Sequence, residues 1–206
     1  ALNMIGLVPQ ADMLLEELSV RENLLYTGRL VLDLPLEVIE GRTDDLLRRL
    51  GLWGIRELAV GHALHKTISG GQRKRLNIAL ELMRNPRVLF VDEPTSGLSS
   101  KDSEQLMELL KGLTFQGTLV VAVIHQPSAA IFRLFDQLWV LDHGGYPIYT
   151  GVPLDALTHF RRLVNHFNAQ HPACSACGNL TPEQIFDIVE TPVLDQRGRP
   201  TNRRRI

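Results

Sequence analysis

The sequence has few of the features that mark secreted, membrane-spanning or nucleic-acid-binding chains. It contains only two cysteines in 206 residues, which fits a reducing, cytoplasmic setting better than a disulfide framework. Its longest apolar run, residues 119–124, is far shorter than the roughly 20 residues that a membrane-spanning helix needs. The formal net charge of -1 argues against broad nucleic-acid binding, which usually requires a strongly basic surface.

The first residues also lack an initiator methionine and a basic stretch before an apolar one. We therefore expect no signal peptide in this part of the protein. The opening letters ALNMIGLVPQ resemble the interior of a domain, and we expect the chain to be part of a longer one. Hydrophobic residues make up 44% of the sequence, which is enough for a packed core over most of its length.

Short apolar segments alternate with helical patterns along the chain. We predict strands at residues 4–8, 88–91, 118–124, 138–141 and 146–149, and helices at residues 19–32, 36–50, 69–84, 99–113 and 153–167, with a last helix that begins at 181–184. This alternation predicts an α/β fold in which helices cover a parallel sheet. The early helical stretch is expected to form an insertion beside that sheet.

Two acidic residues, Asp92 and Glu93, come directly after the buried strand at residues 88–91. Ligands of open parallel sheets bind beyond the carboxyl ends of the strands. A carboxylate there can hold Mg²⁺ beside nucleotide phosphates, and a neighbouring carboxylate can polarise an attacking water. Taken alone, two acids that cap the next loop explain the pattern equally well.

The residues Ser69, Gly70, Gly71 and Gln72 open a predicted helix. A helix N-terminus offers free N–H groups and a positive dipole end, and glycines let the backbone approach a phosphate closely. An ordinary capped helix with a glycine turn is the alternative.

Gln10 and His125 also follow predicted strands. The amide oxygen of Gln10 could serve Mg²⁺ or water, and His125 could contact a terminal phosphate. Each of them alone is explained as well or better by an ordinary turn. Together, three strand ends that each present a polar group, with a glycine-opened helix nearby, predict a nucleotide site.

The segments ISGGQRKR, VLFVDEPTSGLSS and VIHQPS, in this order, resemble the nucleotide-binding domain of ATP-binding cassette (ABC) transporters. The finer pattern is similar to the G subfamily, including YTG at residues 149–151. The resemblance covers residues 5–190 approximately, and NLTPEQIFDIVE resembles the stretch that precedes the membrane domain there. It implies a partial RecA-like P-loop NTPase core with a parallel sheet and a helical signature subdomain.

The resemblance also implies a role for each candidate site residue. Asp92 matches the Walker B aspartate and Gln10 matches the Q-loop glutamine, and both are expected to bind the metal. Glu93 matches the catalytic glutamate, and His125 matches the switch histidine. The signature LSGGQ is matched by Ser69, Gly70, Gly71 and Gln72, and these four, with Gln10 and Ser96, are expected to bind nucleotide. Ile68 stands where the signature has leucine. Ser99 stands where the D-loop of the family has aspartate.

A Walker A loop requires G-x-x-x-x-G-K-[ST], and the sequence contains no Gly-Lys pair. No aromatic residue can be assigned to stack on adenine either. We expect the chain to begin downstream of these parts. We therefore predict that these residues alone bind ATP weakly and hydrolyse none.

The resemblance implies ATP and Mg²⁺ as cofactors and two protein partners. The signature acts on ATP held by a second nucleotide-binding domain, so a dimer is expected. The other partner is the transmembrane domain of an exporter, which places the chain at the cytoplasmic face of a membrane, with no nucleic acid bound. We expect an ABC ATPase domain without its Walker A part at residues 1–151, with a helical subdomain at about 16–84, a helical extension at 152–191, and a basic linker at 192–206 toward a membrane domain.

Two other functions remain open at this point. A soluble ABC ATPase that acts on DNA or translation factors would be expected to carry a coiled coil or second cassette and a more basic surface. Glu93 and His125 argue against a catalytically dead regulatory cassette, and Ser99 leaves that alternative open.

Three smaller patterns are expected to have ordinary explanations. Cys174 and Cys177, with His166 and His171 before them, could form a zinc site, but we expect reduced, unligated thiols. The run of Arg73, Lys74 and Arg75 is interpreted as a solvated helix face. The basic residues 203–205 fit the positive-inside rule for a segment that precedes a membrane domain.

Overall fold

The computed structural model describes residues 4–62, 67–142, 144–163, 181–190, 192–194 and 200–204. The chain divides into two compact units, residues 1–125 and residues 126–206. None of the described helices is both long and apolar enough to cross a membrane. The cysteines at 174 and 177, which are expected to be reduced and unligated, and the histidines at 166 and 171 lie outside the described residues.

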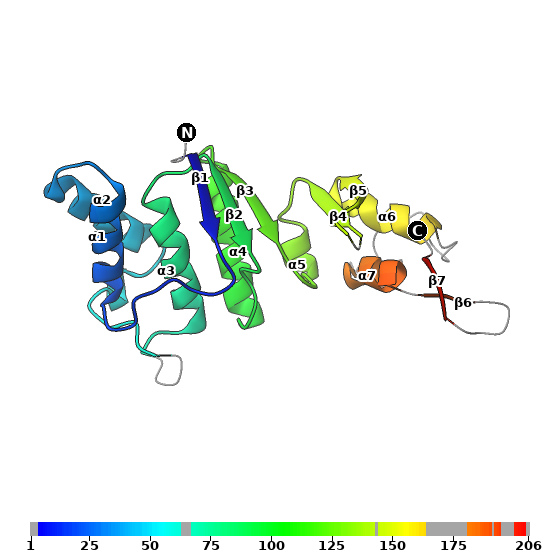
Figure 1. Ribbon diagram of the computed structural model, residues 1–206, viewed down its shortest axis with the longest axis horizontal. Coiled ribbons are helices and arrows are strands. Elements are labelled where there is room, and N and C mark those ends of the chain that lie inside the picture. The colour runs from blue at the N-terminus through cyan, green and yellow to red at the C-terminus, as the bar shows by residue number, and fades with distance from the viewer. Residues whose placement is uncertain are drawn as a thin grey trace. The chain divides into compact units, whose positions relative to one another are not determined.

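The first unit is built on a three-stranded parallel sheet (Figure 1). Its strands are β1 (Ile5–Val8), β2 (Val88–Asp92) and β3 (Leu119–Val123), in the order β1-β2-β3. Val8 is paired with Val91, and Asp92 is paired with Val123, so all three strands end at the same edge of the sheet. This arrangement confirms the predicted α/β class with a parallel sheet.

The two faces of the sheet differ in what covers them. Val8, Leu89 and Val91 are buried on one face, where α3 (Gly70–Leu82) contacts β1 and α4 (Ser100–Thr114) contacts β3. The other face, which we call the bare face, carries exposed apolar side chains of all three strands: Ile5, Leu7, Phe90, Leu119 and Val123. Parallel sheets normally have both faces covered, so the bare face is suited to a further layer.

Helices α1 (Val20–Val31) and α2 (Leu36–Arg49) lie beside α3, on its side away from the sheet (Figure 1). A short 3-10 helix, η2 (Trp53–Ile55), follows them. Ser19 begins α1 with the predicted capping box, because its side chain accepts from the N–H of Glu22 and the Glu22 carboxylate accepts from the N–H of Ser19. Gly28 lets the helices approach closely, since a Cβ there would lie 2.6 Å from Cγ2 of Ile39.

The second unit contains two antiparallel strand pairs and three helices among its described residues. These elements are α5 (Ala129–Phe132), β4 (Leu138–Leu141), β5 (Pro147–Gly151), α6 (Pro153–Leu163), α7 (Glu183–Glu190), β6 (Pro192–Leu194) and β7 (Pro200–Arg204). Phe132, Leu157, Phe160 and Ile185 form the centre of its core. Arg161 joins α6 to α7 by donating from Nε and Nη2 to Oε1 of Gln184 at 2.9 and 2.7 Å.

The pairing of one strand differs from the sequence-based expectation. The strand at residues 138–141 was grouped with the parallel strands, but β4 pairs antiparallel with β5. Gly144 and Gly145 both have positive φ, and they supply the reversal that brings β5 back beside β4. The segment at 192–206, interpreted as a linker, contains the antiparallel pair β6 and β7. Helix α6 is described as far as Leu163, and the rest of the helix predicted at 153–167 lies outside the described residues.

Candidate functional site

Glu93 stands at the centre of the site because the sheet fixes its backbone just beyond the end of β2. Its N–H donates to the carbonyl of Val123 at 3.0 Å, which extends the pairing with β3 by one residue. Its φ is +42°, a left-handed conformation that is uncommon for a residue with a side chain. Strained conformations of this kind are concentrated at functional sites, where neighbouring structure enforces them.

Gln10 and His125, which follow β1 and β3, both contact the carboxylate of Glu93. Nε2 of Gln10 donates to Oε2 of Glu93 at 2.7 Å. Nε2 of His125 lies 3.0 Å from Oε1 of the same residue. The structure therefore brings together three of the residues predicted from strand ends, and Asp92 adjoins them as the last residue of β2. We call Gln10, Asp92, Glu93 and His125 the strand-end cluster.

The strand-end cluster is open to solvent, as a ligand site must be. The side chain of His125 is 75% exposed and that of Glu93 is 25% exposed. Asp92 and Gln10 are exposed as well. A nucleotide or a cation could reach every polar group of the cluster without displacing any of the buried core.

The donor atoms of the cluster fit Mg²⁺. Because the amide nitrogen of Gln10 is turned to Glu93, its amide oxygen is the atom left for a cation, beside the exposed carboxylate of Asp92. Among the described residues, no group of three or more His, Cys, Asp or Glu side chains could hold a metal by itself. Mg²⁺ commonly takes one or two protein oxygens and completes its coordination with phosphates and water.

The glycine-opened helix has the predicted cap. Oγ of Ser69 accepts from the N–H of Gln72 at 3.2 Å, and Oε1 of Gln72 accepts from the N–H of Ser69 at 2.7 Å. A Cβ on Gly71 would lie 3.3 Å from Cγ of Asp102, so the start of α3 packs tightly on the start of α4. A short turn joins α3 to β2, so the helix runs against the strands and begins at the end where they finish (Figure 1).

Ser96 and Ser99 lie in the turns that lead from β2 to α4. The N–H of Ser96 donates to the carbonyl of Glu93 at 3.2 Å, and the Ser96 residue is exposed. Ser99 is the N-cap of α4: its Oγ accepts from the N–H of Asp102 at 3.1 Å and donates to Oδ2 of Asp102 at 2.7 Å. Serine and aspartate are both good N-caps, so the helix start is preserved where the family has aspartate.

The interpretation of the basic run as a solvated helix face is wrong for Arg73, which is buried. Its guanidinium donates to both carboxylate oxygens of Asp12, from Nε at 2.8 Å and from Nη2 at 3.3 Å. These hydrogen bonds to Asp12 raise the pKa of Arg73. Arg73 stands three and four positions before the buried Leu76 and Asn77, and this helical spacing was the signal that could have placed it on the inner face.

Lys74 is half-buried and also makes a specific contact. Its Nζ donates to the backbone carbonyl of Gln10 at 2.5 Å. Burial lowers the pKa of Lys74, although the nearby charges of Asp12, Asp92 and Glu93 act in the opposite direction. The basic run is therefore next to the strand-end cluster, which the sequence did not reveal.

The known proteins that this chain resembles are ABC transporters. A family model described as ABC transporter matches residues 2–96. ABC-type transporter claG of Penicillium crustosum is 44% identical over 144 residues, which cover 69% of this chain and 19% of that protein. ABC transporter G family member 1 of Dictyostelium discoideum is 38% identical over 196 residues, which cover 93% of this chain and 24% of that protein.

The chain belongs to the ABC transporter family. Its resemblance to a nucleotide-binding domain of the G subfamily is confirmed by these relatives, and ABC transporter G family member 22 of Arabidopsis thaliana matches 94% of the chain at 36% identity, over 26% of its own length. Among solved structures, cbiO1 from Clostridium perfringens, part of the ABC transporter complex cbiONQ, is similar with a TM-score of 0.65 and 26% identity. That match covers 79% of this chain and 62% of cbiO1.

The similarity to cbiO1 also confirms the predicted fold, which is part of a RecA-like P-loop NTPase core. The chain spans between 13% and 26% of the length of the ABC transporters that it matches among the curated relatives.

Proposed function

We propose that this chain is part of the ATP-binding and ATP-hydrolysing domain of an ABC exporter of the G type. The observation that carries the proposal is the convergence of Gln10 and His125 on the carboxylate of Glu93, at the ends of three neighbouring parallel strands. This edge is where open α/β sheets bind their ligands. The names of the relatives, which are transporters, favour this function over a soluble ABC ATPase.

In this proposal each member of the strand-end cluster has its own task. Asp92 and the amide oxygen of Gln10 would hold Mg²⁺, and that ion would neutralise charge on the transferred phosphoryl group. Glu93 orients the attacking water and accepts its proton. His125, whose ring lies against Glu93, contacts the terminal phosphate and keeps the Glu93 carboxylate in place.

The start of α3 contacts ATP that is bound to a second nucleotide-binding domain. The free N–H groups at Gly70 and Gly71 and the hydroxyl of Ser69 meet the terminal phosphate of ATP that is bound mainly by another nucleotide-binding domain, and Gln72 holds the cap that orients them. Ser96 contacts nucleotide from the turn after β2. ATP sandwiched in this way drives closure of a dimer, and its hydrolysis lets the dimer open.

The remaining assignments follow from the same proposal. The described residues contain no Walker A loop, so these residues alone are expected to bind ATP weakly and to hydrolyse none. The ATPase part extends to about residue 151, with a helical subdomain at about 16–84, and residues 152–206 lead to the membrane domain. The protein then works at the cytoplasmic face of a membrane, and nucleic acid is not among its partners.

The test is a Glu93→Gln change in the full-length parent protein. We expect ATP to bind with unchanged affinity, hydrolysis to fall by about 100-fold or more, and closed dimers to accumulate with ATP, because the amide keeps the shape of the side chain but cannot accept a proton. Binding, phosphate release and crosslinking between the two nucleotide-binding domains are measured on the same preparation.

Glu108→Gln is the matched control, because Glu108 is an exposed carboxylate on α4. This variant is expected to hydrolyse ATP at the rate of the unchanged protein. Undiminished hydrolysis in the Glu93→Gln protein would refute the role assigned to Glu93.

A further inference from the structure

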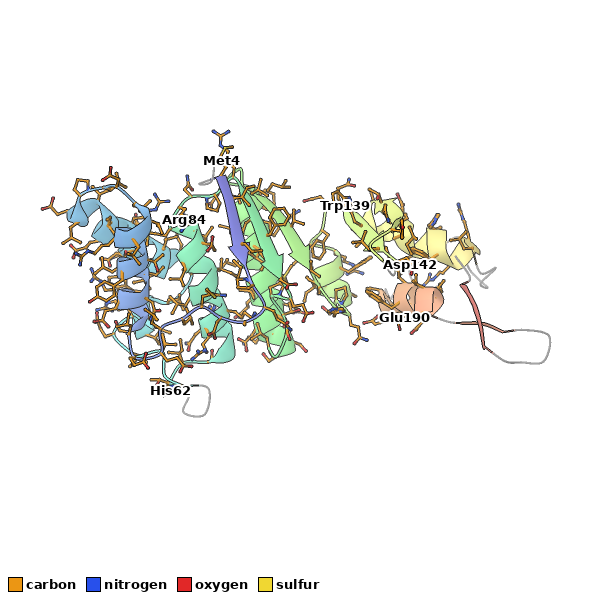
Figure 2. All side chains as sticks on the ribbon, in the orientation of Figure 1. Met4, His62, Arg84, Trp139, Asp142 and Glu190 are labelled. Carbon is orange, nitrogen blue, oxygen red and sulfur yellow. The ribbon has the colours of Figure 1, made fainter. Side chains whose placement is uncertain are left out.

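An acidic side chain of α4 lies against the glycine-opened start of α3. Cγ and Oδ1 of Asp102 are each 3.3 Å from the place where a Cβ on Gly71 would stand. Helix α3 extends from this contact toward Arg84, which lies just beyond its other end, the end away from His62 (Figure 2). The carboxylate is therefore beside the end of α3 that is proposed to meet phosphate.

Hydrogen bonds hold the carboxylate of Asp102 in this place. Its Oδ2 accepts from Oγ of Ser99 at 2.7 Å, and the same Oγ accepts from the N–H of Asp102 at 3.1 Å. Ser99 is the N-cap of α4, so these bonds belong to the helix start itself. The carboxylate therefore cannot turn away from Gly71 without breaking the bond that Ser99 donates.

The charge of Asp102 is not balanced by a nearby base. Within the described part of the chain, no lysine, arginine or histidine forms an ion pair with this carboxylate. The positive ends of the α3 and α4 dipoles favour an acid at this position. They favour a phosphate group at the start of α3 for the same reason, so both anions are attracted to one place and repel each other.

The distance between Asp102 and such a phosphate has an upper bound. A Cβ lies about 2.5 Å from its own backbone nitrogen, so Oδ1 of Asp102 is within about 6 Å of the nitrogen of Gly71. A phosphate oxygen that accepts from this N–H is about 2.9 Å from the nitrogen, and therefore no more than about 9 Å from the carboxylate. The Debye length at about 0.1 M salt is about 10 Å, so the repulsion is felt across this distance.

We infer that Asp102 opposes phosphate binding at the start of α3 and thereby sets the nucleotide concentration at which two nucleotide-binding domains close. This inference rests on the proposed function, in which that start contacts ATP held by a second domain. The phosphate comes near Asp102 only when the domains close, so the repulsion acts on closure and leaves the first binding of ATP unchanged.

The test measures closure in the full-length parent, by energy transfer between probes placed on the two domains. The ligand is the β,γ-imido analogue of ATP with Mg²⁺, at about 0.1 M salt and again at about 1 M salt, where the Debye length is only about 3 Å. Asp102→Asn keeps the shape of the side chain and removes its charge.

At about 0.1 M salt, we expect the Asp102→Asn protein to reach half-maximal closure at an analogue concentration about fivefold lower than the unchanged protein does. A phosphate with about two negative charges, about 9 Å from one carboxylate, produces a factor of this size in the dielectric of water. At about 1 M salt the difference should fall below about twofold, because the salt screens the repulsion.

Two further variants separate charge from shape. Asp102→Ser removes the same charge with a smaller side chain and is expected to give the same shift, so it decides the question if the asparagine variant folds poorly. Asp102→Glu keeps the charge and is expected to close as the unchanged protein does.

The matched control is Glu108→Gln, because Glu108 is an exposed carboxylate on the same helix, about 9 Å further along its axis. It is expected to close at the concentration of the unchanged protein at both salt concentrations.

Each outcome separates the inference from the proposed function. If the unchanged protein closes and the Asp102→Asn and Asp102→Ser proteins need the same or a higher analogue concentration, the inference is wrong and the proposed function stands. A shift that is equally large at both salt concentrations comes from packing, and the inference is again wrong. An equal shift in the Glu108→Gln protein is a general effect of charge and also overturns it. If the unchanged protein does not close with the analogue at all, the proposed function fails as well.

Discussion

Replacing Arg73 by methionine is expected to destabilise the first unit more than any change to an exposed basic residue. The variant leaves the carboxylate of Asp12 and the carbonyl of Gly61 without their donor. Removing one partner of a buried ion pair costs about 3–5 kcal/mol. The side chain of Asp12 is 29% exposed, so water replaces part of the lost interaction, and we take the lower end, about 3 kcal/mol.

Hydrogen exchange in the full-length parent, followed by mass spectrometry, measures this loss. Amide groups of α3 and of residues 12–16 exchange through openings whose free energy the ion pair supports. A loss of about 3 kcal/mol accelerates their exchange by roughly a hundredfold, because each 1.4 kcal/mol is a factor of ten.

Arg84→Met provides the comparison, since Arg84 is exposed and such surface changes stay within about 0.5 kcal/mol. The reasoning would be refuted if exchange in the Arg73→Met protein were accelerated by less than about threefold. That result would mean that the guanidinium contributes no more than a surface charge does.

Further changes test helix packing and capping. Gly28→Ala is expected to destabilise the protein by about 2 kcal/mol, because the new Cβ would lie 2.6 Å from Cγ2 of Ile39. Gly112→Ala is expected to stabilise it by about 0.5–1 kcal/mol, because nothing lies within 4 Å of the new Cβ. Equal effects of the two changes on hydrogen exchange would contradict this reasoning. Ser19→Ala is expected to cost about 1 kcal/mol at neutral pH. Hydrogen bonds with the backbone and then the side chain of Ser19 lower the pKa of Glu22. The ionised carboxylate therefore stabilises the folded protein fully above pH 4.5, the ordinary pKa of that carboxyl. This stabilisation is lost as the pH falls through the lowered pKa. The Ser19→Ala protein keeps the bond from the backbone N–H of Ser19, which is the larger cause of the lowered pKa, and loses only the smaller one. Both proteins should therefore lose stability in acid, the unchanged protein slightly more steeply, and a Ser19→Ala protein with no loss in acid would contradict this order of causes.

The parts of the structure that the sequence predicted well depend on neighbouring residues or on a general rule of parallel sheets. The capping boxes at Ser19 and Ser69 each join residues three positions apart, so their residue types alone indicate them. The end of β2 was predicted within one residue because an apolar run stops at Asp92. The gathering of Gln10, Glu93 and His125 followed from a general property of parallel sheets.

The contacts of Arg73 and Lys74 that the sequence did not predict depend on partners far along the chain. Arg73 binds Asp12 across 61 positions, and no local pattern names that acid as its partner. The bond from Lys74 to Gln10 ends on a backbone carbonyl, and every residue carries a carbonyl, so the sequence cannot single one out. The pairing of β4 with β5 needed a choice between two possible neighbours, and alternation of strands and helices favoured the wrong one.

The bare face of the three-stranded sheet sets a condition for laboratory work on this protein. Leu7 and Leu119 are each 60% exposed there, on β1 and β3, which are the edge strands of this sheet within the described residues. Apolar patches next to open strand edges lead chains to associate with one another. A preparation of these residues alone should therefore bind hydrophobic dyes and precipitate at low protein concentrations.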